Sequence, residues 1–373
     1  MTFDFTDDQY AMAAVMQKVF ADAKTVASTR RWYDGPPPDE QEQRDLGRLL
    51  AEQGLLGAFI GEDLGGSGLD LLDVVMAVEA CGQHLVPYPV ADTLATAWAL
   101  QRWGSESQRA RHLPDVARGR SVPAVAWTAL DGSVVARPRG GDWRLSGERV
   151  VVAFPGLTDL LLLPVAVEGA PWVGLVLVPV TELPLAFRTA WDRAHPVAAL
   201  SVADIVVPQD SFMPLASSAD RGDLAALGRI LAAADILGAM DEVLRRTVAY
   251  LNTRRQFGGP IGRFQALKHR AAWNHTWTQN TRLAVRYAAW SFSQNSPRRA
   301  FYAGLAKAYA SDHGISVAED GVHLHGGMGF TWDSDLHLFL KRVWRLSAHI
   351  GTARECRQDM AVQFLDRAGG TDA

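Results

Sequence analysis

The chain has 373 residues, of which 48% are hydrophobic and 21% are charged, and its formal net charge is −4. These values are ordinary for a globular protein and argue against binding to nucleic acid or to an anionic membrane. A single hydrophobic core usually stops growing at roughly 250–300 residues, so we expect two or three packed subdomains. The two cysteines, Cys81 and Cys356, match no metal or redox spacing, which favours reduced thiols in a cytoplasmic protein.

No membrane or export segment is expected either. The first eight residues are acidic and lack the charged and apolar regions of a signal peptide. The apolar runs near residues 160–163 and 173–180 are shorter than the roughly 20 residues that a membrane helix needs.

The hydrophobic pattern changes twice along the chain. Up to about residue 117, apolar residues are spaced three or four positions apart, which is the spacing of one face of a helix. A glycine-dense loop at 61–68 interrupts this pattern. Short Val- and Leu-rich runs between residues 121 and 216 predict a small antiparallel sheet. The helical period then returns in long segments such as 223–251 and 264–291, which favour a bundle and often a partner subunit. The predicted domains are residues 1–118, 119–217 and 218–373.

A tract at residues 250–265 has the residue types of an anion site. Arg254 offers a fixed fork of donors that suits a pyrophosphate. Gly258 and Gly259 give a turn between two helices, where backbone donors can approach an anion.

A second tract, residues 322–331, contains Gly326 and Gly327, which permit close contact between backbone and ligand. His323 and His325 lie near them, but the surrounding residues supply no third metal ligand at a familiar spacing. We therefore predict no metal site. The imidazole of His323 can still donate one hydrogen bond.

Both tracts resemble signatures of the FAD-dependent acyl-CoA dehydrogenase family: Arg-x-Gln-Phe-Gly-x-Pro-Ile-x-x-Phe-Gln in the first, and Gln-x-x-Gly-Gly-x-Gly-Phe/Tyr in the second, with His323 at the Gln position. The resemblance covers nearly the whole chain. It implies a mainly α fold with a central β domain: an N-terminal helical domain, an antiparallel β-barrel or sheet domain and a C-terminal four-helix bundle. The residues that it implies for FAD binding are Arg254, Gln256, Phe257, Gln265, His323, Gly326, Gly327 and Thr128.

The resemblance also implies a reaction and partners. Family members desaturate an acyl thioester between its α and β carbons and pass the electrons to an electron-transfer flavoprotein or a similar acceptor. They are dimers or tetramers, in which each FAD lies across a subunit interface.

The residues expected around the flavin ring are largely missing. The Thr-Glu-Pro-x-x-Gly-Ser segment appears as residues 127–133 and keeps Thr128 without the Glu-Pro. The Trp-Ile-Thr-Asn segment falls on residues 151–154, where Val151 and Ala153 replace the tryptophan and threonine. The Tyr-Glu-Gly-Thr that carries the base falls on residues 349–352, which puts Ile350 at the glutamate position. The glutamate position of isovaleryl and long-chain types falls on Gly228.

Three hypotheses follow from the missing base. Another residue can serve, with Asp235, two helical turns beyond Gly228, and His349 as candidates, although a paired helix aspartate is the ordinary interpretation of Asp235. Alternatively, the chain is the non-catalytic subunit of a heteromeric dehydrogenase and completes a paralogue's FAD site. Two-gene enzymes of this kind act on steroid side-chain thioesters. A flavin-dependent oxygenase or oxidase on the same fold is the third hypothesis.

Overall fold

The computed structural model describes residues 6–35, 39–169, 173–181 and 183–368. The helices that precede the sheet are α1 (Asp7–Asp22), α2 (Thr25–Asp34), α3 (Glu40–Glu52), α4 (Leu71–Gln83), α5 (Val90–Trp103) and α6 (Glu106–Ala117). Those that follow it are α7 (Ser218–Thr253), α8 (Gln265–Ser293), α9 (Arg299–Leu324), α10 (Gly327–Phe330), α11 (Leu336–Ala348) and α12 (Ala353–Ala368). Within the described ranges, no helix is both long and apolar enough to cross a membrane.

Contacts divide the chain into two compact units. The first contains residues 1–30, 71–86 and 229–373, so α1 and α4 belong with the C-terminal helices. The second contains residues 31–70 and 87–228, in which α3, α5 and α6 accompany the sheets. The predicted order of N-terminal helices, a central β-sheet domain and a C-terminal helical domain is confirmed, and the chain is mostly helical. The boundaries of the three sequence-based domains stay a prediction.

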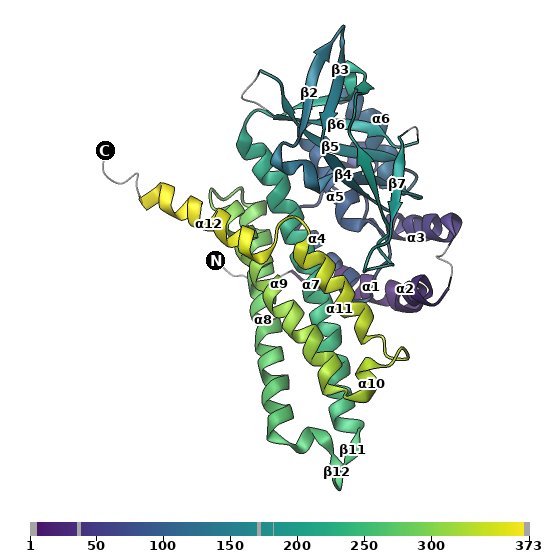
Figure 1. Ribbon diagram of the computed structural model, residues 1–373, viewed down its shortest axis with the longest axis vertical. Helices are drawn as coiled ribbons and strands as arrows, with labels where there is room; N and C mark the ends of the chain where they lie inside the picture. The colour runs from purple at the N-terminus through teal and green to yellow at the C-terminus, as the bar shows by residue number, and fades with distance from the viewer. Residues whose placement is uncertain (1–5, 36–38, 170–172, 182, 369–373) are drawn as a thin grey trace. The chain divides into compact units, whose positions relative to one another are not determined.

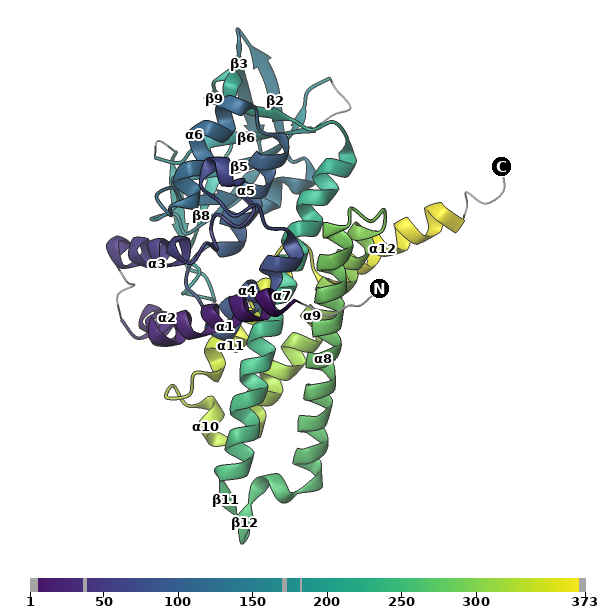
Figure 2. The ribbon, with the colours of Figure 1, turned by 180° about the vertical axis from the view of Figure 1, so that it is seen from behind.

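The first unit is built on long helices. Helices α7, α8, α9 and α11 run alongside one another, and α9 packs against α8, α11 and α12 (Figure 1). A short hairpin of β11 (Arg255–Gln256) and β12 (Gly259–Pro260) joins α7 to α8 at one end of these helices (Figure 2). The anion-site tract is therefore held between two long, rigid elements.

Helices α4 and α7 touch through their backbones at two glycines. A Cβ added to Gly82 would lie 1.9 Å from the carbonyl oxygen of Asp235. A Cβ added to Gly238 would lie 1.8 Å from the carbonyl oxygen of Glu79. No side chain fits in such a space, so these two glycines set the approach of the helices.

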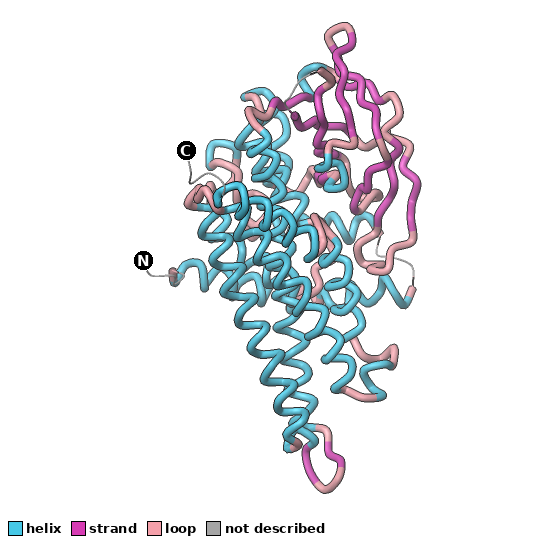
Figure 3. The backbone as a smooth tube through the Cα atoms, turned by 60° about the vertical axis from the view of Figure 1, so that its left-hand side comes forward, coloured by secondary structure: helices cyan, strands magenta, loops and turns pink. Residues whose placement is uncertain are grey.

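The second unit contains the two larger sheets (Figure 3). Its strands are β1 (Pro123–Val125), β2 (Val134–Arg139), β3 (Asp142–Gly147), β4 (Arg149–Ala153), β5 (Leu160–Val167), β6 (Val173–Pro179), β7 (Leu185–Arg188), β8 (Val197–Ser201), β9 (Ile205–Val207) and β10 (Phe212–Pro214). The larger sheet has the order β10-β6-β5-β2-β3-β9, with β1 added to β5, and the smaller one has the order β4-β8-β7.

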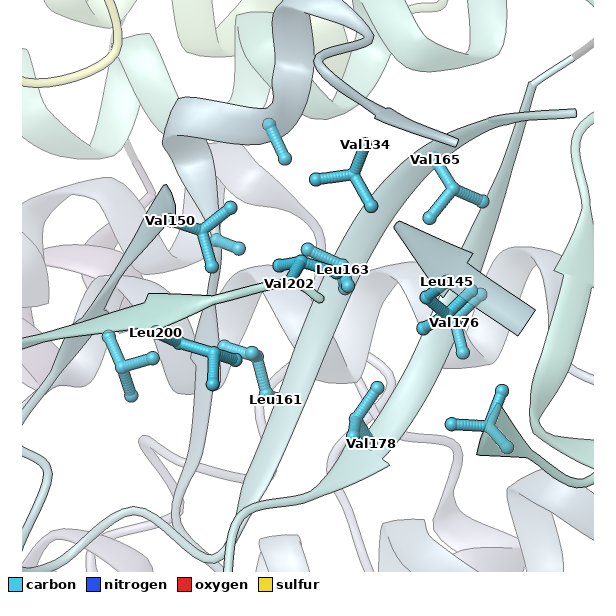
Figure 4. Packing of buried hydrophobic residues seen from close by; sticks show 14 of the residues in the cluster. Val134, Leu145, Val150, Leu161, Leu163, Val165, Val176, Val178, Leu200 and Val202 are labelled. Carbon is cyan, nitrogen blue, oxygen red and sulfur yellow. The ribbon is translucent and has the colours of Figure 1, made fainter. Parts of the chain in front are cut away.

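Most strand pairings are antiparallel, as the sequence predicts, but β5 pairs in parallel with both β1 and β2. Aliphatic residues from both sheets fill the core of this unit, among them Val150 and Leu200 from the smaller sheet and Leu161, Leu163 and Val176 from the larger one (Figure 4). The core explains the Val- and Leu-rich texture of residues 121–216, because side chains buried between sheets must be apolar.

Candidate functional site

The first unit contains a cavity of about 600 Å³ where α7, the β11–β12 hairpin, α8, α9 and α10 meet. Five residues that the sequence predicts as cofactor contacts line it: Arg254, Gln256, His323, Gly326 and Gly327. The remaining lining residues are Tyr250, Ile261, Leu267, Leu324, His325 and Met328. Two sequence tracts about 70 residues apart are thus brought to one place, which has the size of a small-molecule site.

Arg254 supplies the positive charge of the cavity. It follows the last turn of α7, where its backbone N–H donates to the carbonyl oxygen of Tyr250 at 2.8 Å. Its own carbonyl oxygen accepts from the N–H of Ile261 at 2.9 Å, which closes the hairpin. Among the described residues, no carboxylate pairs with its guanidinium. An uncompensated guanidinium on a backbone held in this way suits a phosphate group.

The two glycines make part of the cavity wall accessible. Gly326 has φ 58° and ψ −140°, a conformation that other residues rarely adopt. Neither Gly326 nor Gly327 has an atom within 4 Å of an added Cβ, so the space beside both is open. A ligand can therefore approach the backbone here, as the sequence predicts.

An aromatic pair forms part of the wall. The rings of Tyr250 and His325 stack with their centroids 4.3 Å apart. Nδ1 of His325 lies 2.7 Å from the carbonyl oxygen of Gly321 and must donate to it, since a carbonyl oxygen only accepts. Burial lowers the pKa of His325, which keeps the imidazole neutral at pH 7.

Sequence reasoning missed the roles of Tyr250 and His325 in this cavity. Tyr250 was detectable, because it lies four residues before Arg254 and so on the same helical face. The sequence around His325 raises only the question of a metal ligand. Within the ranges that the structure describes, no group of three His, Cys, Asp or Glu side chains could hold a metal.

Three predicted FAD contacts lie elsewhere. Phe257, at the hairpin tip, has φ 51° and an exposed fraction of 82%, and it meets Phe264 edge to face. Gln265 begins α8. Thr128 belongs to the second unit, where its Oγ1 accepts from the N–H of Val151 at 3.3 Å. The two segments aligned with flavin-ring contacts are thus adjacent within that unit.

The structure also relates the two vacant base positions. Gly228 lies inside α7, and Arg229, the next residue, donates from Nε to the carbonyl oxygen of Ile350 at 3.1 Å. Ile350 is buried and has φ 57°. Neither residue 228 nor residue 350 has a carboxylate, so both positions at which the resemblance expects the catalytic glutamate lack a base.

Neither candidate replacement has the environment of a general base. Asp235 is buried and accepts from Arg342 through both oxygens, at 3.2 Å from Nε and 2.6 Å from Nη2. Burial lowers the pKa of His349 to about 3, with repulsion from Arg345 and Lys307 in the same direction. A base works best with a pKa near the operating pH, so the imidazole of His349 is a poor proton acceptor. The role of each as base stays a prediction; the pairing with Arg342 disfavours Asp235, and the lowered pKa disfavours His349.

Comparison with known proteins identifies the family. Residues 6–120 match the family "Acyl-CoA dehydrogenase, N-terminal domain" and residues 223–361 match "Acyl-CoA dehydrogenase, C-terminal domain". Acyl-CoA dehydrogenase IpdE2 of Mycobacterium tuberculosis is 30% identical over 340 residues, which are 89% of this chain and 92% of the relative. Acyl-CoA dehydrogenase FadE27 of the same organism is 29% identical over 345 residues, 84% of this chain and 86% of the relative.

Solved structures share the fold of the chain. Butyryl-CoA dehydrogenase from Megasphaera elsdenii superposes with a TM-score of 0.87 at 20% identity, over 98% of this chain and 100% of that one. A variant of the Tcur3481-Tcur3483 steroid ACAD gives a TM-score of 0.87 at 25% identity, over 98% and 99% of the two chains.

The chain therefore belongs to the acyl-CoA dehydrogenase family, whose members depend on FAD. It is an oxidoreductase of the acyl-CoA dehydrogenase type, which acts on CH–CH groups.

The Asp235–Arg342 pair can be tested as a structural feature. Asp235→Asn leaves a buried guanidinium without its counter-charge, so we expect the free energy of unfolding to fall by about 3 kcal/mol. Asp235→Leu combined with Arg342→Met should recover most of that loss, because no charge remains buried. Urea titrations followed by tryptophan fluorescence measure both.

As a control, Asp312→Asn removes an exposed partner of Arg357 and should change stability by less than about 1 kcal/mol. An Asp235→Asn protein that keeps its stability and its flavin but is no longer bleached by substrate would contradict the structural role and revive Asp235 as the base.

His349 makes stability sensitive to acid. Its folded-state pKa, about 3, lies below the unfolded value of about 6.5. Protonation therefore favours the unfolded chain, and stability is lost as the pH falls from about 6.5 toward 3. Between pH 6.5 and 5, we expect a loss of about 2 kcal/mol that is absent from His349→Gln. Parallel pH dependences in the two proteins would refute this.

Proposed function

We propose that this chain binds FAD in the cavity at Arg254 and takes part in the α,β-desaturation of an acyl thioester, with the electrons passed to an external acceptor such as an electron-transfer flavoprotein. The observation that carries the proposal is the convergence of Arg254, Gln256, His323, Gly326 and Gly327 on one cavity. Bound FAD would supply the acceptor for the β-hydrogen, which leaves as a hydride.

The cavity offers the complementary chemistry for part of a dinucleotide. Arg254 gives a charged, bidentate donor for a pyrophosphate, and the open backbone at Gly326 and Gly327 permits close approach of the ligand. Tyr250 and Leu267 add apolar surface against which a planar or aliphatic group can pack.

We further propose that the chain acts as the base-lacking subunit of a heteromeric dehydrogenase. Helix α7 carries Arg229 in its first third and leads to Arg254 just past its last residue. At 1.5 Å per residue, these positions are roughly 38 Å apart along the axis. The carbonyl oxygen of Ile350 accepts a hydrogen bond from Arg229. The vacant base position therefore lies near Arg229 and far from the cavity at Arg254 of the same chain.

This separation exceeds the reach of one extended dinucleotide. A flavin whose pyrophosphate binds at Arg254 would therefore react beside the residues of another subunit. The absence of a carboxylate at Gly228 and Ile350, together with the buried pairing of Asp235, supports a partner that brings its own base. The name of the Tcur3481-Tcur3483 steroid ACAD joins two gene products, which supports a paralogous partner and a steroid- or lipid-derived thioester as the substrate class.

Arg254 is the residue whose loss should affect FAD binding most directly. When the chain is co-expressed with a paralogue that keeps the glutamate, we expect Arg254→Ala to lower the FAD content of the purified complex at least tenfold, since a charge-assisted bidentate contact is lost. Arg255→Ala is the matched control: the neighbouring arginine is equally charged and exposed but does not line the cavity. The ratio of absorbance at 450 nm to that at 280 nm measures the content. Equal losses in both variants would refute the assignment of the cavity.

Co-expression separates the subunit from a self-sufficient enzyme. We expect the chain purified alone to be colourless or substoichiometric in flavin, and to turn yellow when it is co-expressed with a paralogue that keeps the glutamate. Stoichiometric flavin that substrate bleaches in the chain alone would contradict the subunit proposal. Substrate-dependent oxygen uptake without an added acceptor would instead indicate the oxygenase or oxidase.

A further inference from the structure

The turn between α11 and α12 has a backbone conformation that its residues do not favour. Ile350 has φ 57° and Gly351 has φ 97°, so two consecutive residues are left-handed. Glycine adopts this region without cost, whereas a β-branched residue there is a genuine outlier. A helix that ends in a left-handed residue ordinarily uses glycine or asparagine for it. The conformation of Ile350 must therefore be imposed by its surroundings.

Lys307, on the neighbouring helix α9, supplies one part of these surroundings. Its side chain has an exposed fraction of 0%. Its Nζ donates to the carbonyl oxygen of Ser347 at 3.0 Å, to that of Gly351 at 2.9 Å and to Oγ of Ser311 at 3.0 Å. An ammonium group has three donors, and all three are used. The carbonyl of Ser347 belongs to the last turn of α11, where a cation is also favoured by the helix dipole.

Arg229 holds the carbonyl between these two. Its Nε donates to Ile350, and its Nη2 pairs with Asp359 of α12 at 2.6 Å. On the far side of the turn, Thr352 and Glu355 form a capping box: the N–H of Thr352 donates to Glu355 Oε2 at 2.7 Å, and the N–H of Glu355 to Thr352 Oγ1 at 3.3 Å. The turn is thus fixed by two cations and by the start of α12.

We propose that Lys307 and Arg229 are positioning residues, which hold residues 347–351 so that the side chain of residue 350 is presented in a left-handed conformation. This is the position at which the chain lacks the base, so the support for a proton-abstracting carboxylate persists without the carboxylate. The interpretation of residue 350 rests on the proposed function. The existence of the support rests on the contacts of Lys307 and Arg229 alone.

Two substitutions of Ile350 test whether the left-handed conformation is imposed. Ile350→Asn introduces a residue that tolerates this region, and Ile350→Thr a β-branched residue of similar size and polarity that does not. In the full-length chain, we expect the equilibrium constant for unfolding to be about fivefold or more smaller for Ile350→Asn than for Ile350→Thr. Urea titrations give the ratio of the unfolding constant of Ile350→Thr to that of Ile350→Asn. A ratio of one or below overturns the proposal.

Lys307→Met, combined with each of these substitutions, tests whether Lys307 imposes the left-handed conformation of residue 350. Once the turn is free to relax, we expect the ratio between the Asn and Thr variants to fall toward one. A lysine that only filled space would lower the stability of both variants equally and leave the ratio unchanged, which would overturn its positioning role. Should Lys307→Met fail to fold, Arg229→Gln removes the bond to Ile350 and is judged by the same ratio.

The flavin absorbance of the same samples keeps this test separate from the proposed function. Residues 307 and 350 do not line the cavity at Arg254. A chain that stays flavin-free even when it is co-expressed with a paralogue that keeps the glutamate, and that shows the expected ratio, would count against the FAD proposal alone. A flavin-loaded chain with a ratio of one would count against the positioning role alone.

Discussion

The direct backbone contact between α4 and α7 is the constraint on which the first unit depends. Because Gly82 and Gly238 leave no room for a side chain, the two helices lie as close as their main chains allow. The contact sits beside the buried pair of Asp235 and Arg342, which ties α11 to the same stretch of α7. Helix α7 is thereby fixed over its middle, and the groups at its two ends take their positions from it.

Those two groups have different chemistry. At one end, Arg254 presents an uncompensated positive charge beside an open glycine backbone, which is an arrangement for binding an anion. In the first third of the helix, Arg229 pairs with Asp359 and donates to the carbonyl oxygen of Ile350, which is an arrangement for holding a turn. The same residue type thus serves recognition in one case and backbone positioning in the other, and only the surrounding partners distinguish the two roles.

Sequence motifs located the cavity because its residues lie in two short tracts, each with a local signature. They could not reveal that α1 and α4 pack with the C-terminal helices, since that depends on contacts between distant segments. The partner of Asp235 lies 107 residues away in α11, so sequence reasoning predicts the type of interaction but not the partner. The parallel pairings of β5 were missed for the same reason.

The conformation of Ile350 marks a different limit of sequence reasoning. A β-branched residue argues against a left-handed turn, so local propensity points away from what the structure contains. The residues that determine this conformation are Arg229 and Lys307, which are remote from Ile350 in the sequence. Neither stands in a sequence pattern that marks it as a partner of the turn. Local rules fail at a turn whose geometry is imposed by tertiary hydrogen bonds.

The continuity of α7 has a consequence for how such a chain can vary. Each residue of an α-helix advances the chain by about 1.5 Å along the helix axis and rotates it by about 100° around that axis. Deleting one residue between Arg229 and Arg254 would therefore rotate the anion cavity by more than a quarter of a turn relative to the turn at Ile350. A deletion between Asp235 and Gly238 would also move one of the two glycine contacts out of register with α4. The helix can accept many exchanges of side chains, but its residue count between these arginines is fixed.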